Sequence, residues 1–308
     1  MVRTMDSYQG KIVKGVGGNY ETYVEGLGIV VCRAKGILRY RKTPPLIGDD
    51  VTLTVDETGA GNIEEILPRK NALVRPAVAN VDQALIVCAI REPDFLPNLL
   101  DRFLILMKRQ DVPVLICFNK QDLADASEAE RLASIYRECA AGVFVTQASK
   151  PGSVDRLREA LRGKTTVLAG PSGVGKSTIM NALHPDANME VGGLSRKILR
   201  GKQTTRHTQL FQIESNTFLC DTPGFSSLYL PDITPDELAD YYPEFASFSG
   251  QCRYPDCIHR REPECAVRAA VENGTIAKER YDSYCLLYEE LSGTRIIYSR
   301  KPKHSDGV

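Results

Sequence analysis

The sequence predicts a multidomain α/β protein, and three observations along the chain support this. Residues 1–72 hold short strand-like runs separated by Gly, Pro and Asp turns, which indicates a small all-β domain. Residues 73–232 alternate apolar strand-like runs with amphipathic helical stretches, the pattern of βαβ units around a mostly parallel sheet. Residues 233–308 have a helical pattern interrupted by a cluster of Cys and His residues. We therefore expect three domains with these bounds.

The composition is that of an ordinary globular protein, with 43% hydrophobic and 25% charged residues. The 39 basic and 39 acidic side chains give a formal net charge of zero, so contact with nucleic acid has to come from local basic clusters. No apolar run approaches the ~20 residues that span a membrane, and the N-terminus lacks an apolar stretch typical of a signal peptide. We expect a cytoplasmic protein without membrane association.

The expected all-β domain contains four clear strand-like runs, GKIVKG, NYETYV, GIVVCRA and DDVTLTVDE. Val51, Leu53 and Val55 alternate with Thr52 and Thr54, which is the period of a half-buried strand. About five short strands in this length suit a small barrel of the OB type. A generic small β domain would show the same pattern, so the pattern alone leaves both open.

The expected α/β domain contains the apolar runs QALIVCAI, VPVLICF, TTVLAG and TFLCDT. Ser127 and Glu130 have the spacing of a capping box, which predicts a helix over the following RLASIYREC. Cys88 and Cys117 lie within apolar runs. We interpret them as small buried hydrophobic residues in a reducing compartment.

A phosphate-binding loop is predicted at GPSGVGKS, which fits G-x-x-x-x-G-K-[ST] between the strand TTVLAG and the helix STIMNAL. Its glycines let successive N–H groups face phosphate oxygens, and the helix N-terminus adds partial positive charge. Lys176 is expected to reach the β- and γ-phosphates and Ser177 to bind Mg²⁺. The expected nucleotide contacts are Gly170, Pro171, Ser172, Gly173, Val174, Gly175, Lys176, Ser177 and Thr178.

A second motif, NKQD, follows the strand VPVLICF and predicts which base is bound. The Asp122 carboxylate can accept both hydrogens of the N1–H and N2–H₂ edge of guanine, whereas adenine offers no such donor pair. Asn119 can bond the base and brace the loop, and the stem of Lys120 can lie over the ring. The later ASK fits the loop that closes over guanine O6 through a backbone N–H, which adds Ala148 and Ser149 to the expected contacts.

The motif DTPG follows the strand TFLC and predicts the Mg²⁺ side of the site. Asp221 can hold Mg²⁺ through water, and the Gly224 N–H can meet the γ-phosphate. The polar stretch before this strand contains TTRHT, in which a threonine can complete the Mg²⁺ shell only when the γ-phosphate is present. We favour Thr205 for this switch role, with Thr204 as the alternative.

Hydrolysis needs a group that orients water, and many GTPases carry a glutamine after the DTPG motif. Here Phe225 follows Gly224, and a phenylalanine cannot orient water. Either another residue orients the water, or intrinsic GTP hydrolysis is slow and a partner stimulates it. His207 is the nearby candidate, because a neutral imidazole can orient or deprotonate water, although it can equally contact RNA or pack structurally. The expected catalytic residues are Lys176, Thr205 and His207.

A zinc site is predicted at Cys252, Cys257, His259 and Cys265, which have the spacing C-x₄-C-x-H-x₅-C. Three thiolates and one imidazole complete a tetrahedral set and leave no open position, so we expect one structural Zn²⁺. Before this cluster, the run from Thr234 to Glu237 predicts a helix start, and a long helical stretch is expected from about 263 to 291. The final RIIYSRKPKH is basic and expected to be mobile.

Two basic clusters are candidates for contact with RNA phosphates. One surrounds the Cys and His residues, and the other lies between the phosphate loop and the DTPG strand. They consist of Arg253, Arg260, Arg261 and Arg268, and of Arg196, Lys197, Arg200, Lys202 and Arg206. A solvated charged surface is the alternative for both, and the neighbouring Glu262 and Glu264 favour it in the first cluster.

The order of the motifs is unusual, because base recognition at residue 119 precedes the phosphate loop at residue 170. Most GTPases place the phosphate loop first, so the sequence indicates a circular permutation. With GPSGVGKS, NKQD, TTRHT, DTPGF, this order, the first β domain and the metal cluster, the chain resembles the ribosome small subunit-dependent GTPases, the RsgA or YjeQ family. The match covers nearly the whole chain.

The resemblance implies an OB-type barrel, a circularly permuted P-loop GTPase domain and a C-terminal helical zinc-binding domain. It implies hydrolysis of GTP to GDP with Mg²⁺, stimulated by the small ribosomal subunit and its rRNA, in late maturation of that subunit. A monomer is the expected state.

Two other functions stay open. A permuted GTPase could act on another ribosome-assembly or RNA target, such as the large subunit, although the front β domain and the metal cluster would then be unexplained. The chain could also be a nucleic-acid-binding module with a vestigial nucleotide site. Intact Lys176, Ser177 and Asp221 disfavour that reading.

Overall fold

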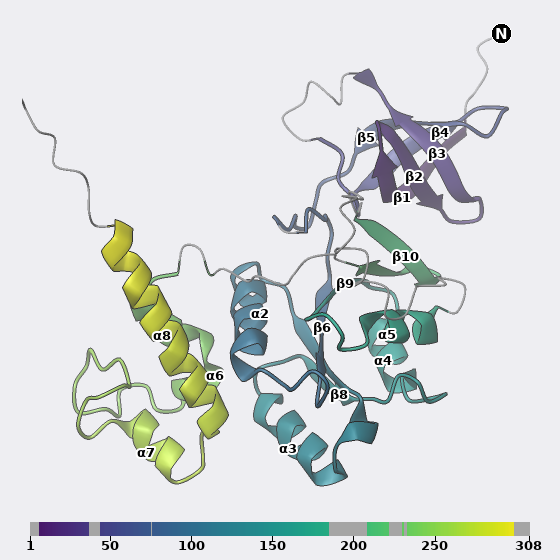
Figure 1. The fold of residues 1–308 in the computed structure, drawn as a ribbon. Helices are drawn as coiled ribbons and strands as arrows, with labels where there is room; N and C mark the ends of the chain where they lie inside the picture. Colours follow the sequence, from purple (N-terminus) through teal and green to yellow (C-terminus); the bar gives the residue numbers. More distant parts are fainter. Residues whose placement is uncertain are drawn as a thin grey trace, which may run out of the picture.

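The computed structural model describes residues 6–36, 44–74, 76–184, 208–221, 230 and 233–298. These residues form a five-stranded barrel, a central sheet with helices on both faces, and a C-terminal helical region, hereafter residues 233–298 (Figure 1). Within them, no helix is both long and apolar enough to span a bilayer.

The barrel closes on itself in the strand order β1-β2-β3-β5-β4-β1. Among its described strands, β3 and β5 form the one parallel pair. The strands are β1 (Asp6–Val16), β2 (Asn19–Val24), β3 (Gly28–Ala34), β4 (Asp50–Val55) and β5 (Gly61–Ile66). Val51 and Leu53 point into the barrel core and are fully buried, as their alternation with threonine predicted. The expected small barrel of about five strands is therefore confirmed.

The central sheet has the order β10-β11-β9-β6-β7-β8, and all neighbours from β11 to β8 are parallel. Its strands are β6 (Gln83–Ala89), β7 (Val114–Asn119), β8 (Gly142–Val145), β9 (Thr165–Ala169), β10 (Gln209–Glu214) and β11 (Thr217–Asp221). The mostly parallel sheet was predicted, but β8 and the antiparallel β10 were not. Both are only partly buried, so they lack the continuous apolar run that marks a central strand.

Four helices cover the two faces of this sheet. They are α2 (Pro97–Arg109), α3 (Ala126–Tyr136), α4 (Asp155–Leu161) and α5 (Lys176–Leu183). Successive residues of β6 alternate between the two layers: Ile86 and Cys88 pack with α2 and α3, whereas Leu85 and Val87 pack with α4 and α5. Because both faces are covered, β6 and β7 are buried along their whole length.

Helix α3 begins earlier than the sequence predicted. Its first residue is Ala126 and its N-cap is Asp125, so Ser127 lies inside the helix and the expected capping box is wrong. The side chain of Glu128, in the first turn, instead accepts hydrogen bonds from Arg91. A first-turn acid also interacts favourably with the helix dipole, which helps this earlier start.

The barrel and the central sheet are joined edge to edge. Lys14 of β1 pairs with Gln209 of β10, so the strands form one continuous sheet of eleven (Figure 1). Beside this pair, the rings of Tyr23 and Phe218 meet edge to face with centroids 5.6 Å apart. Val13 of the barrel belongs to the core of the central sheet. The barrel is thus packed against the sheet rather than tethered by a linker.

The chain that leaves the barrel is held by a buried ion pair. Asp49 is fully buried, and its carboxylate accepts two hydrogen bonds from Arg69, at 2.6 and 2.8 Å, and one from the Leu46 N–H at 2.7 Å. Ile47 forms a parallel bridge with Val78 close by. A carboxylate with this many donors keeps one geometry.

The C-terminal region contains η4 (Pro235–Tyr241), α6 (Pro243–Ala246), α7 (Ala266–Glu272) and α8 (Lys278–Tyr298). The helix start at Thr234 is confirmed with a complete capping box, although the helix is 3₁₀. The single stretch expected from 263 to 291 is wrong, because it is two helices. Gly274 has φ +79°, and the Asn273 side chain accepts hydrogen bonds from Thr275, which ends α7. Helix α8 continues into the basic tail, and residues after 298 lie outside the described part.

We predict that a methyl group at Gly48 destabilises the junction after the barrel. Gly48 has φ +88°, and a Cβ there would lie 2.1 Å from the Ala79 carbonyl oxygen. Gly48→Ala should lower the free energy of unfolding by about 2–5 kcal/mol, measured by urea denaturation, because strain and overpacking add.

Gly59→Ala is the matched control. Gly59 has φ +82°, but a Cβ there meets nothing within 4 Å. Only the backbone strain of about 1–2 kcal/mol should remain. If both variants lost the same free energy of unfolding, the close contact between position 48 and the Ala79 carbonyl oxygen would have no role.

Candidate nucleotide and metal sites

The predicted phosphate loop connects the end of β9 to the start of α5 and requires glycine at two positions. Gly170 has φ +139°, and a Cβ there would lie 2.1 Å from the Val87 carbonyl oxygen. Gly175 has φ +97°, and its Cβ would lie 2.3 Å from Nδ2 of Asn119. The loop therefore runs directly against β6 and β7, and its backbone turns at the N-terminus of α5.

Lys176 is held over the phosphate loop. Its Nζ donates hydrogen bonds to the carbonyl oxygens of Gly170, at 2.8 Å, and Pro171, at 2.6 Å. Burial lowers the pKa of Lys176, and the nearby Asp221 carboxylate opposes that change. Asp221 ends β11 beside Leu168 of β9, so the ammonium and the carboxylate share one edge of the sheet. Next to Lys176, both Ser177 and Thr178 are half-buried in the first turn of α5.

Asn119, the last residue of β7, joins three loops through one side chain. It is 3% exposed, and its Nδ2 donates to the Val174 carbonyl in the phosphate loop at 3.0 Å. Its Oδ1 accepts from the Thr146 hydroxyl at 3.1 Å and from the Ala148 N–H at 3.0 Å. Both ends of the carboxamide are thus used inside the protein, so Asn119 braces the site.

The predicted base loop follows directly. Lys120 has φ +62°, and its Nζ donates to the carbonyl of Glu92 in the loop before α2. Asp122 lies in the 3₁₀ turn η1 (Gln121–Leu123), and its carboxylate is exposed at the mouth of the site. Ser149 follows Ala148 and is also exposed. The residues expected to contact guanine therefore lie together beside the phosphate loop.

Several predicted residues lie outside the described part of the chain. These are Thr205, His207 and Gly224, together with Thr204, Phe225, Arg196, Lys197, Arg200, Lys202 and Arg206. Their expected roles stay predictions.

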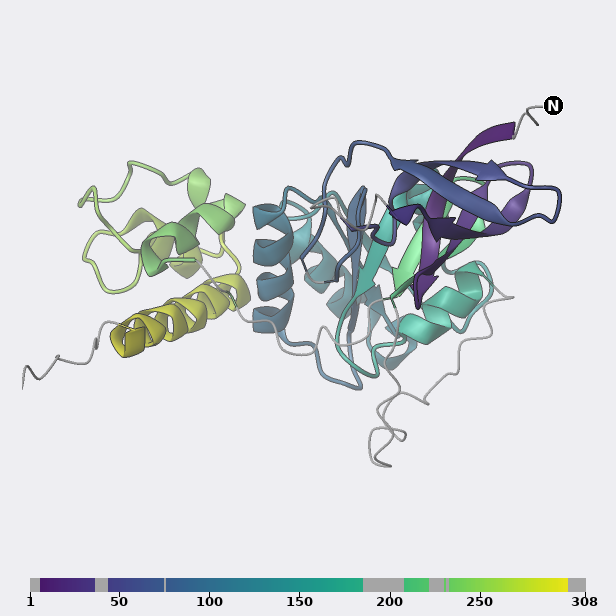
Figure 2. The same cartoon turned by 90° about the horizontal axis from the view of Figure 1, so that it is seen from above.

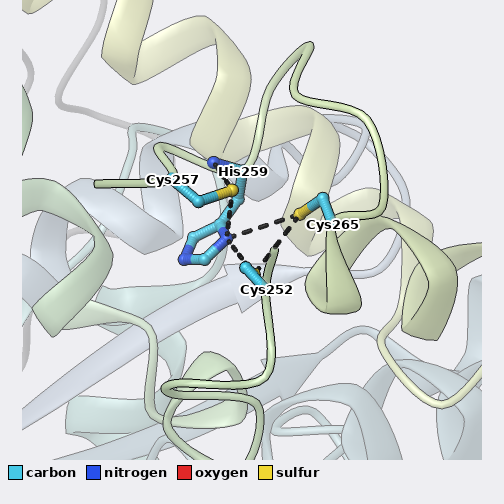
Figure 3. A group of neighbouring side chains, drawn as sticks. All are labelled: Cys252, Cys257, His259 and Cys265. Atoms are coloured by element: carbon cyan, nitrogen blue, oxygen red, sulfur yellow. Dashed lines mark hydrogen bonds between the residues drawn. The ribbon is translucent and has the colours of Figure 1, made fainter. Parts of the chain in front are cut away.

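The four predicted metal ligands come together in the loop between α6 and α7 (Figure 3). His259 Nδ1 lies 3.5 Å from the sulfur of Cys252, 3.5 Å from that of Cys257 and 3.4 Å from that of Cys265. The sulfur atoms of Cys252 and Cys265 are 3.9 Å apart. A tetrahedral zinc site places sulfur pairs about 3.8 Å apart and sulfur–nitrogen pairs about 3.5 Å apart. The donors therefore fit one tetrahedral ion.

The metal loop is fixed by contacts from its own region. The hydroxyl of Tyr281 donates to the His259 carbonyl and that of Tyr284 to the Ile258 carbonyl, both at 2.8 Å. The Glu262 carboxylate accepts from the backbone N–H groups of Arg260 and Arg261 at 2.9 and 3.0 Å. These contacts preorganise the ligand positions.

The arginines around the metal loop are mostly paired within the protein. The guanidinium of Arg253 pairs with Glu264, and that of Arg260 pairs with Glu289 and lies 5.1 Å from the ring centroid of Tyr288. Arg268 donates to the Glu262 carbonyl at 3.3 Å. Arg261 is exposed. Three of the four arginines, all except Arg261, therefore already bond to groups of the protein. For these three, the alternative of a charged surface fits better than a basic patch that binds RNA.

Two parts of the site were missed by sequence reasoning. Thr146 and the loop at Glu92 and Pro93 contact the two predicted motifs, yet no motif marks them. A Cβ on Gly173 would lie 3.7 Å from Pro93, so this loop also borders the phosphate loop. The contacts arise because β6 lies between β7 and β9 and β7 lies next to β8, which only the strand order reveals.

Comparison with known proteins covers nearly the whole chain. The family described as RsgA GTPase matches residues 66–231, and the RsgA N-terminal domain matches residues 9–63. A protein named small ribosomal subunit biogenesis GTPase RsgA from Agathobacter rectalis is 47% identical over 294 residues, covering 92% of this chain and 97% of the relative. The protein of that name from Alkaliphilus metalliredigens is 43% identical over 290 residues, covering 93% and 99%.

Two solved structures share the fold. The crystal structure of YjeQ from Thermotoga maritima has a TM-score of 0.77 and 35% identity, covering 94% of this chain and 99% of the other. YloQ, described as a circularly permuted GTPase, has a TM-score of 0.75 and 34% identity, covering 96% and 98%. With the phosphate loop and the base loop joined in the reversed chain order, the chain belongs to the RsgA family of circularly permuted GTPases.

Proposed function

We propose that this GTPase acts in late maturation of the small ribosomal subunit and that the subunit stimulates its hydrolysis of GTP. One observation carries the proposal. Asn119 joins the phosphate loop to the loop at Ala148, in a chain that is related over 92% of its length to a small ribosomal subunit biogenesis GTPase. Work on ribosomal subunits would place the protein in the cytoplasm, and we propose that it acts as a monomer.

For the nucleotide, we propose that Asp122 pairs with the guanine edge. The Ala148 N–H is already donated to Asn119, so we assign the contact with guanine O6 to the N–H of Ser149. Lys120 lies over the base, and Lys176 leaves the loop carbonyls to meet the β- and γ-phosphates. The other contacts remain those of the predicted loop from Gly170 to Thr178.

The Mg²⁺ that accompanies GTP in this family neutralises charge on the phosphates. The residues proposed to hold it are Ser177, Asp221 and Thr205. Ser177 and Asp221 fit, because the hydroxyl begins α5 and the carboxylate ends β11 near the Lys176 ammonium. Gly224 is proposed to meet the γ-phosphate and His207 to orient the attacking water. A need for stimulation is supported by Phe225, which cannot orient water where many GTPases carry a glutamine.

For the metal loop, we propose one structural Zn²⁺ bound by Cys252, Cys257, His259 and Cys265. Four protein donors leave no position for substrate, so the ion serves folding. RNA contact is assigned to the barrel and to the exposed Arg261, together with the basic residues before Thr208.

The first test compares GTP turnover with purified small subunits, with large subunits, and alone. Small subunits should raise turnover by about tenfold or more, because a partner can complete the catalytic site of a slow GTPase. Large subunits are the control and should have no effect. Equal effects of both subunits, or none, would move the function to another RNA or assembly target.

The second test changes the base contact with Asp122→Asn. Loss of a charge-assisted hydrogen bond should weaken GTP binding roughly 10- to 150-fold. Binding of xanthosine triphosphate should improve, because the new amide donates toward the xanthine carbonyl. Asp125→Asn is the matched control, since Asp125 is an exposed carboxylate with no capping hydrogen bond. Unchanged selectivity in Asp122→Asn would refute the assignment.

The third test removes one metal ligand with Cys257→Ala. Bound zinc, measured by atomic absorption, should fall from one ion to a small fraction, and the melting temperature should drop because metal binding drives folding of the loop. Cys285→Ala is the control, because Cys285 lies in the same region and is no ligand. Retained zinc with unchanged melting would remove Cys257 from the ligand set.

A further inference from the structure

Helix α2 lies between the phosphate loop and the C-terminal region (Figure 2). On the side of the nucleotide site, Leu99, Leu100 and Phe103 line a cavity of about 160 Å³. The opposite wall of this cavity is the phosphate loop, through Pro171 and Val174. A shift of α2 therefore changes the packing behind the phosphate loop.

On its other side, α2 carries the buried carboxylate of Asp101, which is hydrogen-bonded by residues of the C-terminal region. Asp101 is fully buried, and its carboxylate accepts hydrogen bonds from the guanidinium of Arg280 and from the Tyr242 hydroxyl at 3.4 Å. Ser283 also contributes a hydrogen bond to Asp101. All three partners belong to the C-terminal region. Burial raises the pKa of Asp101 to about 6, and Arg280 opposes that rise.

Arg280 of α8 has two acidic partners, and only one of them is on α2. It is 2% exposed, and its Nε donates to Glu244 of α6 at 2.6 Å while Nη1 donates to Asp101. Its guanidinium lies 4.5 Å from the ring centroid of Tyr242 and 5.3 Å from that of Tyr136 on α3. Asp101 thus links the C-terminal region to α2. Glu244 has no such contact with α2, although its carboxylate also accepts a hydrogen bond at 3.8 Å from the thiol of Cys139, which follows α3.

A buried charge pair of this kind holds one geometry, because a partner that slides away leaves a desolvated charge unpaired. Three further contacts follow the same interface. Arg102 of α2 pairs with Glu290 of α8, and Asn98 donates to Ser283 at 3.4 Å. The Lys108 ammonium donates to the Asp240 carbonyl. Polar contacts thus join the C-terminal region to α2 along the helix, from Asn98 to Lys108.

We propose that α2 couples the guanine nucleotide site to the metal-binding C-terminal region, and that Asp101 and Arg280 are the positioning residues that transmit this coupling. The inference rests on the proposed function of the nucleotide site. Because coupling is reciprocal, a nucleotide that shifts the phosphate loop changes α8, and a partner on the C-terminal region changes the phosphate loop.

The experiment measures hydrogen exchange of α8 amides in the full-length zinc-loaded protein, with GDP and with a non-hydrolysable GTP analogue plus Mg²⁺. In the wild-type protein, the exchange rates should differ by about fivefold or more between the two nucleotides. Asp101→Asn should abolish that difference while leaving the GDP dissociation constant within about threefold, because Asp101 does not touch the nucleotide.

Glu244→Gln is the matched control, since it removes the other acid that contacts Arg280 but leaves the link to α2. It should keep the nucleotide-dependent difference. Arg280→Lys provides a second test should Asp101→Asn fail to fold, because a single ammonium retains the charge but cannot hold both acids in the guanidinium geometry. This variant should also lose the difference.

The inference is overturned if the exchange rates of α8 in the wild-type protein are the same with both nucleotides. It is also overturned if Asp101→Asn keeps the wild-type difference in these rates. It is also overturned if Glu244→Gln loses the difference to the same extent, because general loosening then explains both. A titration with GDP comes first. If the protein binds no guanine nucleotide, the proposed function itself is wrong. If it binds the nucleotide but hydrogen exchange in α8 does not change, only the proposed coupling is wrong.

Discussion

The nucleotide site depends on one buried carboxamide, that of Asn119. Its amide nitrogen and its oxygen hold the phosphate loop, Thr146 and the loop at Ala148, so no other side chain in the described site touches as many motifs. Each lost hydrogen bond at such a buried group costs about 1–3 kcal/mol, because its partner stays desolvated. The phosphate loop and the loop at Ala148 are therefore held in place by the same group.

The sequence predicted most of the central fold, because phosphate loops and base loops have residue spacings dictated by ligand chemistry. The long apolar strands and the fit of Cys252, Cys257, His259 and Cys265 to one ion were likewise predictable. The break between α7 and α8 was missed, because Asn273 and Gly274 lie in an otherwise helical pattern. The pairing of Asp101 with Arg280 had no local signal, since 179 residues separate them along the chain.

Electrostatics inside this protein are mostly local. The formal net charge is zero, and many basic side chains form ion pairs with acidic ones. Arg69 pairs with Asp49, and Arg260 pairs with Glu289. Such pairs position backbone segments and contribute little long-range field. Within the part of the chain that the structure describes, this charge distribution therefore provides little long-range attraction for a polyanion.

The place of β9 beside β6 has a consequence for folding during synthesis. Strand β6 pairs on one side with β7, its neighbour in sequence, but its other edge pairs with β9, and Gln83 meets Thr166 there. At synthesis rates of 5–20 residues per second, that edge waits roughly 4–16 seconds for its partner to leave the translating ribosome. During this interval the nascent chain carries an open apolar strand edge, so the permuted order prolongs the time in which β6 can pair with a wrong strand.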